Sequence, residues 1–345
     1  MNGEARIVSV IVPCRNERGH VEAFASSALS QRVPEGWQLE IVIADGESDD
    51  GTAEALAALG TSDARVVVVA NPGRIVSTGL NAALAKARGE VLVRMDVHTT
   101  YASDYVAECI AALERTGADN VGGPWRAESA AGGGAMQAAI VAAFQSAAAA
   151  GGALSRRIDY EGEADTVYLG AWPRRTFARW GGFDEALVRN QDDEHNLRIT
   201  KGGGRIWQSA RIRSAYRPRA RLGQVFRQYL QYGYWKPFVM KKHGQAASMR
   251  HGVPALFVVA LALGIVATLA GFGWPLVLLL LAYAAVVMSL AAAVARASRL
   301  PMAALLRVPV VIAACHVAYG IGSVAGAWDA YVARRVRAAF THLSR

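Results

Sequence analysis

An acid and an imidazole stand two residues apart at Asp96 and His98, in the segment VRMDVHT. In an extended chain the side chains of residues i and i+2 lie on the same side, so both groups can contact one ligand. Carboxylate oxygen suits Mg²⁺, and an imidazole shifts the preference toward Mn²⁺. Such an ion can bridge two phosphates and stabilise negative charge on a leaving group. An Asp at a strand end is also a common turn residue, so the pair alone leaves both interpretations open.

Three consecutive acids, Asp192, Asp193 and Glu194, follow much later in the chain. One of these carboxylates can accept a proton from an attacking hydroxyl group if the fold brings it close to Asp96. Acids are also favoured in the first turn of a helix by its dipole, and the three residues can divide these two roles. We expect the next residue, His195, to lie on the surface of the helix that follows.

The segments that must position these groups alternate between short apolar runs and helical patterns. We predict strands at 7–12, 39–44, 65–70 and 89–95, with helices at 21–31, 48–59 and 77–86. The strands are too apolar to have a wet face, which predicts an α/β fold with a mainly parallel, Rossmann-like sheet covered by helices. Ligands bind beyond the carboxyl ends of such strands. The polar clusters at 15–17, 45–46 and 96–98 all fall at those ends.

Asp45 is the acid of the second cluster, at the end of the predicted strand 39–44. Its carboxylate can hydrogen-bond a ribose or an amide-bearing base. Alternatively it belongs to an acidic turn that caps the helix expected at 48–59. The residue by itself favours the capping role.

The last third of the chain has a different composition. Apolar runs at 253–273, 275–295 and 308–328 each approach the ~20 residues that a membrane-spanning helix needs. We expect a soluble domain at 1–222, amphipathic interfacial helices at 223–251, about three membrane helices at 252–333 and a basic tail at 334–345. Three scattered cysteines indicate neither a disulfide framework nor a zinc site.

Charge suggests how the soluble domain is oriented. The net charge is +9, and a run of lysines and arginines between 211 and 250 precedes the first apolar run. This placement is typical of the cytoplasmic side of a membrane and of contact with anionic lipid headgroups. No N-terminal signal-peptide pattern is present, so we expect a cytoplasmic domain on the inner membrane. Nucleic-acid binding is disfavoured because no motif for it accompanies the charge. Three spans would place the tail arginines outside, against the positive-inside rule, so the topology stays open.

The segment RQYLQYGYWK carries amides and aromatic rings just before the first apolar run. Gln231, Tyr234 and Trp235 suit the ring of a sugar. Tyrosine and tryptophan are equally common in the interfacial belt of a membrane protein. The two interpretations are equally supported by the residues.

Taken in order, these segments resemble the family 2 glycosyltransferases of the GT-A fold. The matching motifs are IVSVIVPCRNE, IVIADGESDDGT, NPGRIVSTGLNAAL, VRMDVHTTY, WGGFDE, NQDDEHNLRI and QYGYW. VRMDVHTTY stands where the family has D-x-D, and QYGYW where its polymerising members have Q-x-x-R-W. The resemblance spans roughly residues 7–236. Within the family, the D-x-H variant and the C-terminal apolar runs are most similar to succinoglycan-type exopolysaccharide glucosyltransferases.

The resemblance implies a role for each candidate residue. The nucleotide-sugar donor would contact Pro13, Arg15, Asn16, Glu17, Asp45, Ser77, Asn81 and Asp96. A Mn²⁺ or Mg²⁺ ion would be bound by Asp96 and His98. Asp192 would be the general base, with Glu194 as its structural or acceptor-binding partner. The acceptor would contact Gln231, Tyr234 and Trp235.

Two departures from the family pattern matter. Gln191 stands in place of a glutamate, so Asp193 remains an alternative base. Tyr234 stands in place of the arginine of Q-x-x-R-W, which favours the addition of one sugar over processive polymerisation.

The expected function is metal-dependent, inverting transfer of a hexose. The best guess is glucose from a UDP-sugar, moved to a lipid-linked or polysaccharide acceptor among membrane lipids. A processive synthase and a non-catalytic nucleotide-binding scaffold are the alternatives. A dinucleotide-dependent oxidoreductase is disfavoured because no G-x-G-x-x-G follows the first strand.

Overall fold

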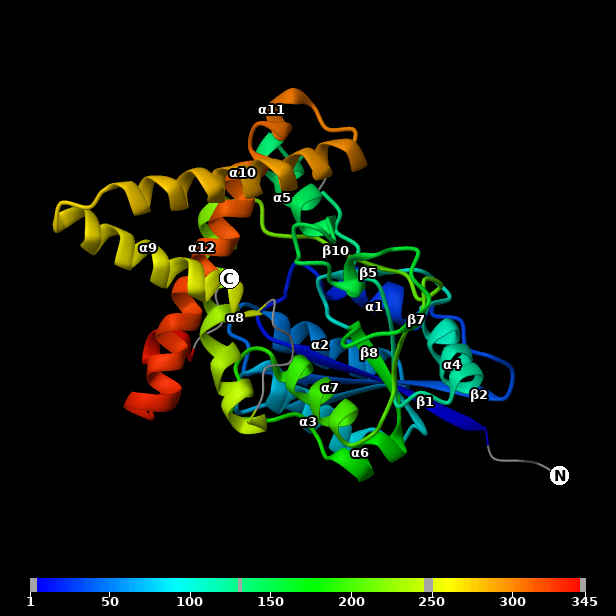
Figure 1. The fold of residues 1–345 in the computed structure, drawn as a ribbon. Helices are drawn as coiled ribbons and strands as arrows, with labels where there is room; N and C mark the ends of the chain where they lie inside the picture. The colour runs from blue at the N-terminus through cyan, green and yellow to red at the C-terminus, as the bar shows by residue number, and fades with distance from the viewer. Residues whose placement is uncertain (1–4, 130–131, 245–250, 342–345) are drawn as a thin grey trace. The chain divides into compact units, whose positions relative to one another are not determined.

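The computed structural model describes residues 5–129, 132–244 and 251–341 (Figure 1). The chain forms two compact units. Unit 1 comprises Met1–Arg126, Leu154–Leu187 and Gln191–Arg217. Unit 2 comprises Ala127–Ala153, Val188–Asn190 and Pro218–Arg345.

Unit 1 is built on an eight-stranded sheet with the order β3-β2-β1-β4-β8-β6-β9-β7. The strands are β1 (Arg6–Cys14), β2 (Trp37–Asp45), β3 (Val66–Ala70), β4 (Val91–Arg94), β6 (Asn120–Gly123), β7 (Gly162–Glu163), β8 (Tyr168–Pro173) and β9 (Ile206–Gln208). The first four strands in this order are parallel, and β8 runs antiparallel to both β4 and β6. The predicted α/β fold with a mainly parallel sheet is confirmed.

Helices cover both faces of this sheet, as its apolar strands require. Alternate residues of β1 point to opposite faces, so Val10 and Val12 pack into one core cluster and Ile11 into the other. The first cluster takes in residues of α1 (Val21–Leu29), α2 (Thr52–Ser62) and α4 (Tyr105–Thr116). The second takes in residues of α3 (Val76–Lys86), α6 (Arg174–Trp180) and α7 (Gln191–Lys201). A small second sheet pairs β5 (Thr99–Tyr101) with β10 (Ser214–Tyr216), and η1 spans Leu154–Arg156.

Unit 2 is helical in the part of the chain that the structure describes. Its elements are α5 (Ala135–Gln145), α8 (Leu222–His243), α9 (Val253–Leu269), α10 (Trp274–Ala297), α11 (Met302–Leu305), α12 (Val308–Ala327), η3 (Trp328–Ala333) and η4 (Ala338–Phe340). Among the described residues, two helical segments are long and apolar enough to cross a membrane, Trp274–Ala297 and Met302–Ala333. The first of the three expected runs forms the shorter helix α9. Many large apolar side chains of these helices are exposed.

Glycines bring α8 and α12 into backbone contact. A Cβ atom added at Gly322 would lie 2.1 Å from the carbonyl oxygen of Leu230, and one at Gly326 would lie 2.1 Å from that of Tyr234. The two glycines are four residues apart and therefore share one face of α12. Small residues at this spacing are typical of helix pairs in membranes, where close approach replaces the hydrophobic driving force.

Candidate active site

The carboxyl ends of β1 and β2 form the first part of the site. Asp45 ends β2 and accepts hydrogen bonds from the hydroxyl of Ser48 at 2.6 Å and from its backbone N–H at 3.2 Å. The backbone N–H of Asn16, after β1, donates to the same hydroxyl at 2.8 Å. Asp45 thus closes its own turn and fixes the neighbouring loop through Ser48. Its contact with a base or ribose stays a prediction.

Further hydrogen bonds join the two loops. Asn16 adopts a left-handed backbone with φ 51°, which asparagine tolerates. Its side-chain amide donates to Asp49 at 2.7 Å, and the backbone N–H of Asp49 donates back at 2.9 Å. The backbone N–H of Glu17 donates to the hydroxyl of Thr52 at 2.8 Å. These loops therefore form one pre-organised edge above the sheet.

Arg94 is a buried cation that the sequence patterns did not single out. Its guanidinium donates from Nε to Oδ1 of Asp96 at 2.9 Å and from Nη2 to Oδ2 at 3.1 Å. Only 8% of the Arg94 side chain is exposed, against 17% for Asp96. Burial alone would lower the pKa of Arg94, but the charges of Asp96 and Asp192 raise it well above its ordinary value. The sequence feature that could have identified Arg94 is an arginine at the end of an otherwise apolar strand.

The structure brings Asp192 into electrostatic contact with this pair. Burial raises the pKa of Asp192, the neighbouring charge of Asp193 raises it further, and the charge of Arg94 opposes both effects. Asp192 also accepts a hydrogen bond from the backbone N–H of Asp193 at 3.0 Å, in the first turn of α7. A carboxylate with a raised pKa is well suited to accept a proton near neutral pH.

The next two residues of α7 face the interior. Glu194 is fully buried and accepts from Arg198 Nε at 3.2 Å and from Nη2 at 2.5 Å, so it has a structural partner. The expected surface position of His195 is wrong, because its side chain is fully buried. It stacks on Phe177 with 5.3 Å between ring centroids, and its Nε2 lies 3.2 Å from the carbonyl oxygen of Gly181. Burial and the charge of Arg198 lower the pKa of His195 to about 4.

His98 lies beside Glu17 after β4. Its Nδ1 is 3.3 Å from Oε1 of Glu17, and 42% of its side chain is exposed. Burial would lower the pKa of His98, but the hydrogen bond to Glu17 and the charge of Asp96 raise it above its ordinary value. The described residues contain no cluster of three or more acidic, histidine or cysteine side chains arranged to hold a metal ion. Metal binding by Asp96 and His98 stays a prediction.

An aromatic cluster of Trp125, Tyr168 and Tyr216 contacts His98 through Tyr216, on segments that the sequence analysis did not assign to the site. Trp125 stacks on Tyr168 with 5.9 Å between ring centroids, and Tyr216 lies edge-on to His98 at 6.1 Å. The guanidinium of Arg156 lies 3.3 Å from the centre of the Trp125 ring. Trp125 follows the end of β6, and the GGPW segment at this strand end was the available signal.

Ser77 and Asn81 were expected to contact the nucleotide-sugar donor. In the structure both side chains hold the segment that precedes α7. The hydroxyl of Ser77 donates to the carbonyl of Leu187 at 3.0 Å. The amide of Asn81 donates to the carbonyl of Phe183 and accepts from its backbone N–H, both at 2.8 Å. Direct contact of these residues with a nucleotide stays a prediction.

Pro13 and Arg15 lie at the same edge of the sheet, and each packs closely against a glycine. A Cβ atom at Gly79 would lie 3.3 Å from that of Pro13, and one at Gly46 would lie 3.1 Å from that of Arg15. The loops at the strand ends are therefore packed closely around both residues. Their role in donor binding also stays a prediction.

The three expected acceptor residues belong to α8 of unit 2. Tyr234 is fully buried, donates to Oδ2 of Asp329 at 2.9 Å and stacks on Phe340 at 3.8 Å. Trp235 is buried and donates to the carbonyl of Phe340 at 3.2 Å. Gln231 accepts from Arg189 at 3.3 Å. These contacts stabilise unit 2, and the acceptor role stays a prediction.

Comparison with known proteins assigns the family. The model of "Glycosyl transferase family 2" matches residues 9–167. The "Succinoglycan biosynthesis protein ExoA" of Rhizobium meliloti is 32% identical over 277 residues, which are 77% of this chain and 78% of that protein. The chain belongs to glycosyl transferase family 2.

A further relative and a solved structure are also similar to this chain. The chondroitin synthase of Pasteurella multocida is 28% identical over 104 residues, 30% of this chain and 10% of its own. A mannosyltransferase from Pyrobaculum calidifontis, solved with GDP-Man and Mn²⁺, aligns with a TM-score of 0.56 at 19% identity. That alignment covers 95% of this chain and 88% of the solved one, and it shows a shared fold. The match to the family 2 model includes Asp45 and Asp96 and ends before Asp192.

Proposed function

We propose that this family 2 glycosyltransferase moves a hexosyl group from a nucleotide-diphosphate sugar to a lipid-linked or polysaccharide acceptor, with inversion. The observation that carries the proposal is the buried Arg94 at the end of β4, which makes two hydrogen bonds to Asp96 and whose pKa is also raised by the charge of Asp192. The two acids are far apart in the sequence, and the charge of each raises the pKa of the same buried cation, which supports a shared site. UDP-glucose is the preferred donor, and the similarity to a succinoglycan biosynthesis protein supports a role in exopolysaccharide synthesis.

The reaction uses the two acids in different ways. Asp192 takes the proton of the acceptor hydroxyl, whose oxygen attacks the anomeric carbon from the face opposite the nucleotide. A carbon–oxygen bond forms, the bond to the diphosphate breaks, and the nucleoside diphosphate leaves with the electron pair. Arg94 holds the Asp96 carboxylate through two hydrogen bonds, which fixes it toward the diphosphate. The donor-binding edge is completed by the joined loops around Asn16 and Asp45.

The residues at the end of β4 fit a divalent ion. Metal-binding histidines commonly donate their second ring N–H to a carboxylate, and Glu17 lies at Nδ1 of His98 in this way, which leaves Nε2 for the ion. The Asp96 carboxylate has lone pairs beyond those that Arg94 uses. Mg²⁺ in nucleotide sites is bound by one or two carboxylates together with substrate phosphates, so two protein ligands suffice. Mn²⁺ or Mg²⁺ at Asp96 and His98 would supply electrophilic stabilisation of the leaving diphosphate.

The second unit supports a membrane setting for the acceptor. Two helices long and apolar enough to cross a bilayer follow the catalytic unit, which favours a lipid-linked acceptor at the inner membrane face. Transfer of a single sugar is the preferred outcome because Tyr234 is engaged by Asp329 where polymerising relatives carry an arginine. A processive synthase is the second candidate, and the sequence similarity to a chondroitin synthase favours it.

The deciding experiment measures nucleotide release from a panel of UDP- and GDP-sugars with native lipid extract. Each donor is tested with Mn²⁺, with Mg²⁺ and with EDTA, and the variant Asp96→Ala is the matched control. We expect metal-dependent release from one donor and none from the variant. A single added sugar in the product would support the preferred proposal, and a ladder of lengths would support the synthase. Absence of release from every donor, with unchanged donor binding in Asp96→Ala, would favour a non-catalytic scaffold.

A further inference from the structure

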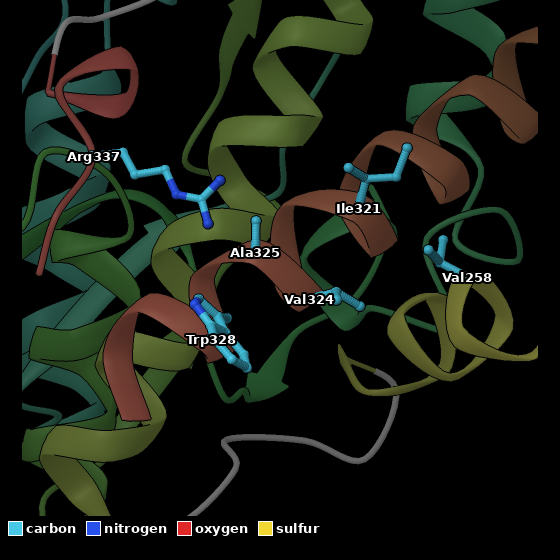
Figure 2. Close-up of a pocket in the computed structure, with 6 residues that line it drawn as sticks. All are labelled: Val258, Ile321, Val324, Ala325, Trp328 and Arg337. Carbon is cyan, nitrogen blue, oxygen red and sulfur yellow. The ribbon is translucent and has the colours of Figure 1, made fainter. Parts of the chain in front are cut away.

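A mostly apolar groove lies within unit 2, between α9 and the end of α12. It has a volume of about 440 Å³ and is lined by Val258, Ile321, Val324, Ala325, Trp328 and Arg337 (Figure 2). Five of these side chains are apolar or aromatic, and the sixth is a guanidinium. Figure 2 shows the side chain of Arg337 extending from the C-terminal segment toward the α12 helix near Ala325.

The helix crossing explains why the groove forms there. A Cβ atom at Gly320 would lie 2.3 Å from the carbonyl oxygen of Pro254, so α9 and α12 are in backbone contact at this point. Val258 and Val324 lie one helical turn beyond the two contacting residues and line the groove. The groove therefore follows directly from the close crossing, and its walls are side chains that water does not solvate well.

Arg337 is held in place by a buried acid. Its Nε lies 2.6 Å from Oδ2 of Asp329, and its Nη2 donates to Oδ1 at 3.2 Å. Asp329 is fully buried and also accepts from the hydroxyl of Tyr234. Across the described ranges, Nη1 of Arg337 has no hydrogen-bond partner, and 42% of the side chain is exposed. A guanidinium carries more N–H donors than these two bonds use, so Arg337 can bind an anion while it stays anchored.

The charge around the anchored guanidinium is positive overall. Arg335 lies 4.0 Å from Asp329, and the ammonium group of Lys241 donates to the carbonyl of Ala330. Arg335 and Arg337 thus both face Asp329, and Lys241 is bonded to the residue that follows it. Arginine binds phosphate through paired hydrogen bonds, because its planar guanidinium matches the spacing of the phosphate oxygens.

The neighbouring surface has the composition of a membrane interface. Trp328, Tyr331, Val332 and Val336 are all exposed beside the cations. Aromatic rings with arginines and lysines at the end of an apolar helix are typical of the headgroup level of a bilayer. These features are complementary to a ligand that has an acyl chain on one side and an anionic group on the other.

We propose that the groove binds an anionic phospholipid, with an acyl chain against Val258 and Val324 and the phosphate on Arg337. The proposal rests on the match between a groove with apolar walls and one charged end and a lipid with the same distribution. It does not depend on the transferase activity. A bound lipid would stabilise the segment that carries Asp329 and Arg337 against α8.

The test uses native mass spectrometry of the full chain in detergent and measures the affinity for the first lipid molecule that binds. Dioleoylphosphatidylglycerol is the probe, and dioleoylphosphatidylcholine, with the same acyl chains, is the neutral comparison. We expect Arg337→Gln to weaken binding of phosphatidylglycerol roughly tenfold or more, because a charge-assisted hydrogen bond is lost. Val324→Trp fills the groove without changing a charge and should weaken it similarly. Arg296→Gln, an exposed arginine at the end of α10, is the matched control and should bind as the wild type does.

Several results would overturn the proposal. One is equal binding of the two lipids by the wild type, with no effect of Val324→Trp. A second is inorganic phosphate binding as tightly as phosphatidylglycerol, which would mean that the groove walls contribute nothing. A third is displacement of phosphatidylglycerol by an isoprenyl phosphate at equal concentration, which would assign the groove to an isoprenoid lipid. Because Arg337 also pairs with Asp329, the melting temperature of each variant is recorded. If Arg337→Gln does not fold, the binding of phosphatidylglycerol to Val324→Trp tests the proposal instead.

Discussion

Each unit of the molecule contains an aspartate–arginine ion pair. The two pairs differ in which partner is the more exposed to solvent. In unit 1 the arginine is the hidden partner, since 8% of Arg94 and 17% of Asp96 are exposed. In unit 2 the aspartate is hidden, since Asp329 is fully buried and 42% of Arg337 is exposed. Both pairs are close, with 2.9 Å from Arg94 to Asp96 and 2.6 Å from Arg337 to Asp329.

The difference shows how one type of ion pair can serve two kinds of ligand. A hidden arginine fixes an acid and presents it to groups that carry positive charge or a proton. A hidden aspartate fixes a guanidinium and presents it to anions. A buried ion pair contributes little net stability because desolvation offsets its attraction, so the value of each pair lies in the group that it positions.

The prediction with the largest expected effect tests whether Asp192 of unit 1 acts as the general base. Asp192→Asn should lower the rate of sugar transfer by about 10²–10⁴-fold, because a general base contributes on that order. Its pKa is raised in the folded protein, so the fold disfavours the charge and the melting temperature should not fall. Transfer kinetics and donor binding are measured separately, and donor binding should be retained. Asp193→Asn is the control, and if it abolishes transfer while Asp192→Asn does not, the base is Asp193.

The second prediction concerns Arg94, the buried partner of the ion pair in unit 1. Arg94→Met leaves the Asp96 carboxylate beside an apolar side chain, and the loss of one partner of a buried pair costs roughly 3–5 kcal/mol. Arg94→Lys keeps the charge but loses the paired geometry and should retain most of the stability with reduced transfer. Chemical unfolding and the kcat of transfer are the two measurements. Equal stability of Arg94→Met and wild type would show that the pair is not structurally coupled.

The third prediction concerns His195, which is buried and whose ring nitrogen lies 3.2 Å from the carbonyl oxygen of Gly181. Its pKa is about 4 in the folded protein against 6.5 in the unfolded chain. The unfolded chain therefore binds the proton first, and stability is full above about pH 6.5 and falls as the pH drops toward 4. The loss is on the order of 3 kcal/mol. Urea unfolding from pH 7 to 4 measures it, and His195→Phe, matched to the surrounding rings, should show a smaller dependence on pH.

The smallest effect tests the packing that hides Asp329 in unit 2. Gly326→Ala places a Cβ atom 2.1 Å from the carbonyl oxygen of Tyr234, the residue that bonds Asp329. Overpacking of this kind costs roughly 1–3 kcal/mol. Gly273→Ala is the control, since its Cβ would meet only the methyl group of Thr268 at 3.7 Å. Thermal unfolding in detergent compares the two, and equal melting temperatures would contradict the close helix contact.

Much of the catalytic unit was predictable from local sequence. The alternation of apolar runs with helical patterns predicted the parallel strands, which is confirmed, and the ligand-binding edge after them stays a prediction. Both depend on short-range periodicity, which a few adjacent residues encode completely. The motif around Asp96 and His98 and the acids from Asp192 were also visible in neighbouring residues, and their roles stay predictions.

Partners across the fold were not predictable in the same way. The sequence shows an arginine at 94 and a histidine at 195, but not that Arg94 acts on Asp192 or that aromatic rings enclose His195. The glycines of α12 were visible as small residues, while their contact with α8 was not.

The sequence by itself thus determined the alternation of strands and helices up to β4, the acids at the strand ends and the apolar character of the last third. Tertiary structure decided which charge faces which, and which member of each pair is exposed. The reason is physical: periodicity and composition act over neighbouring residues, whereas burial and electrostatic pairing arise only when distant segments pack together.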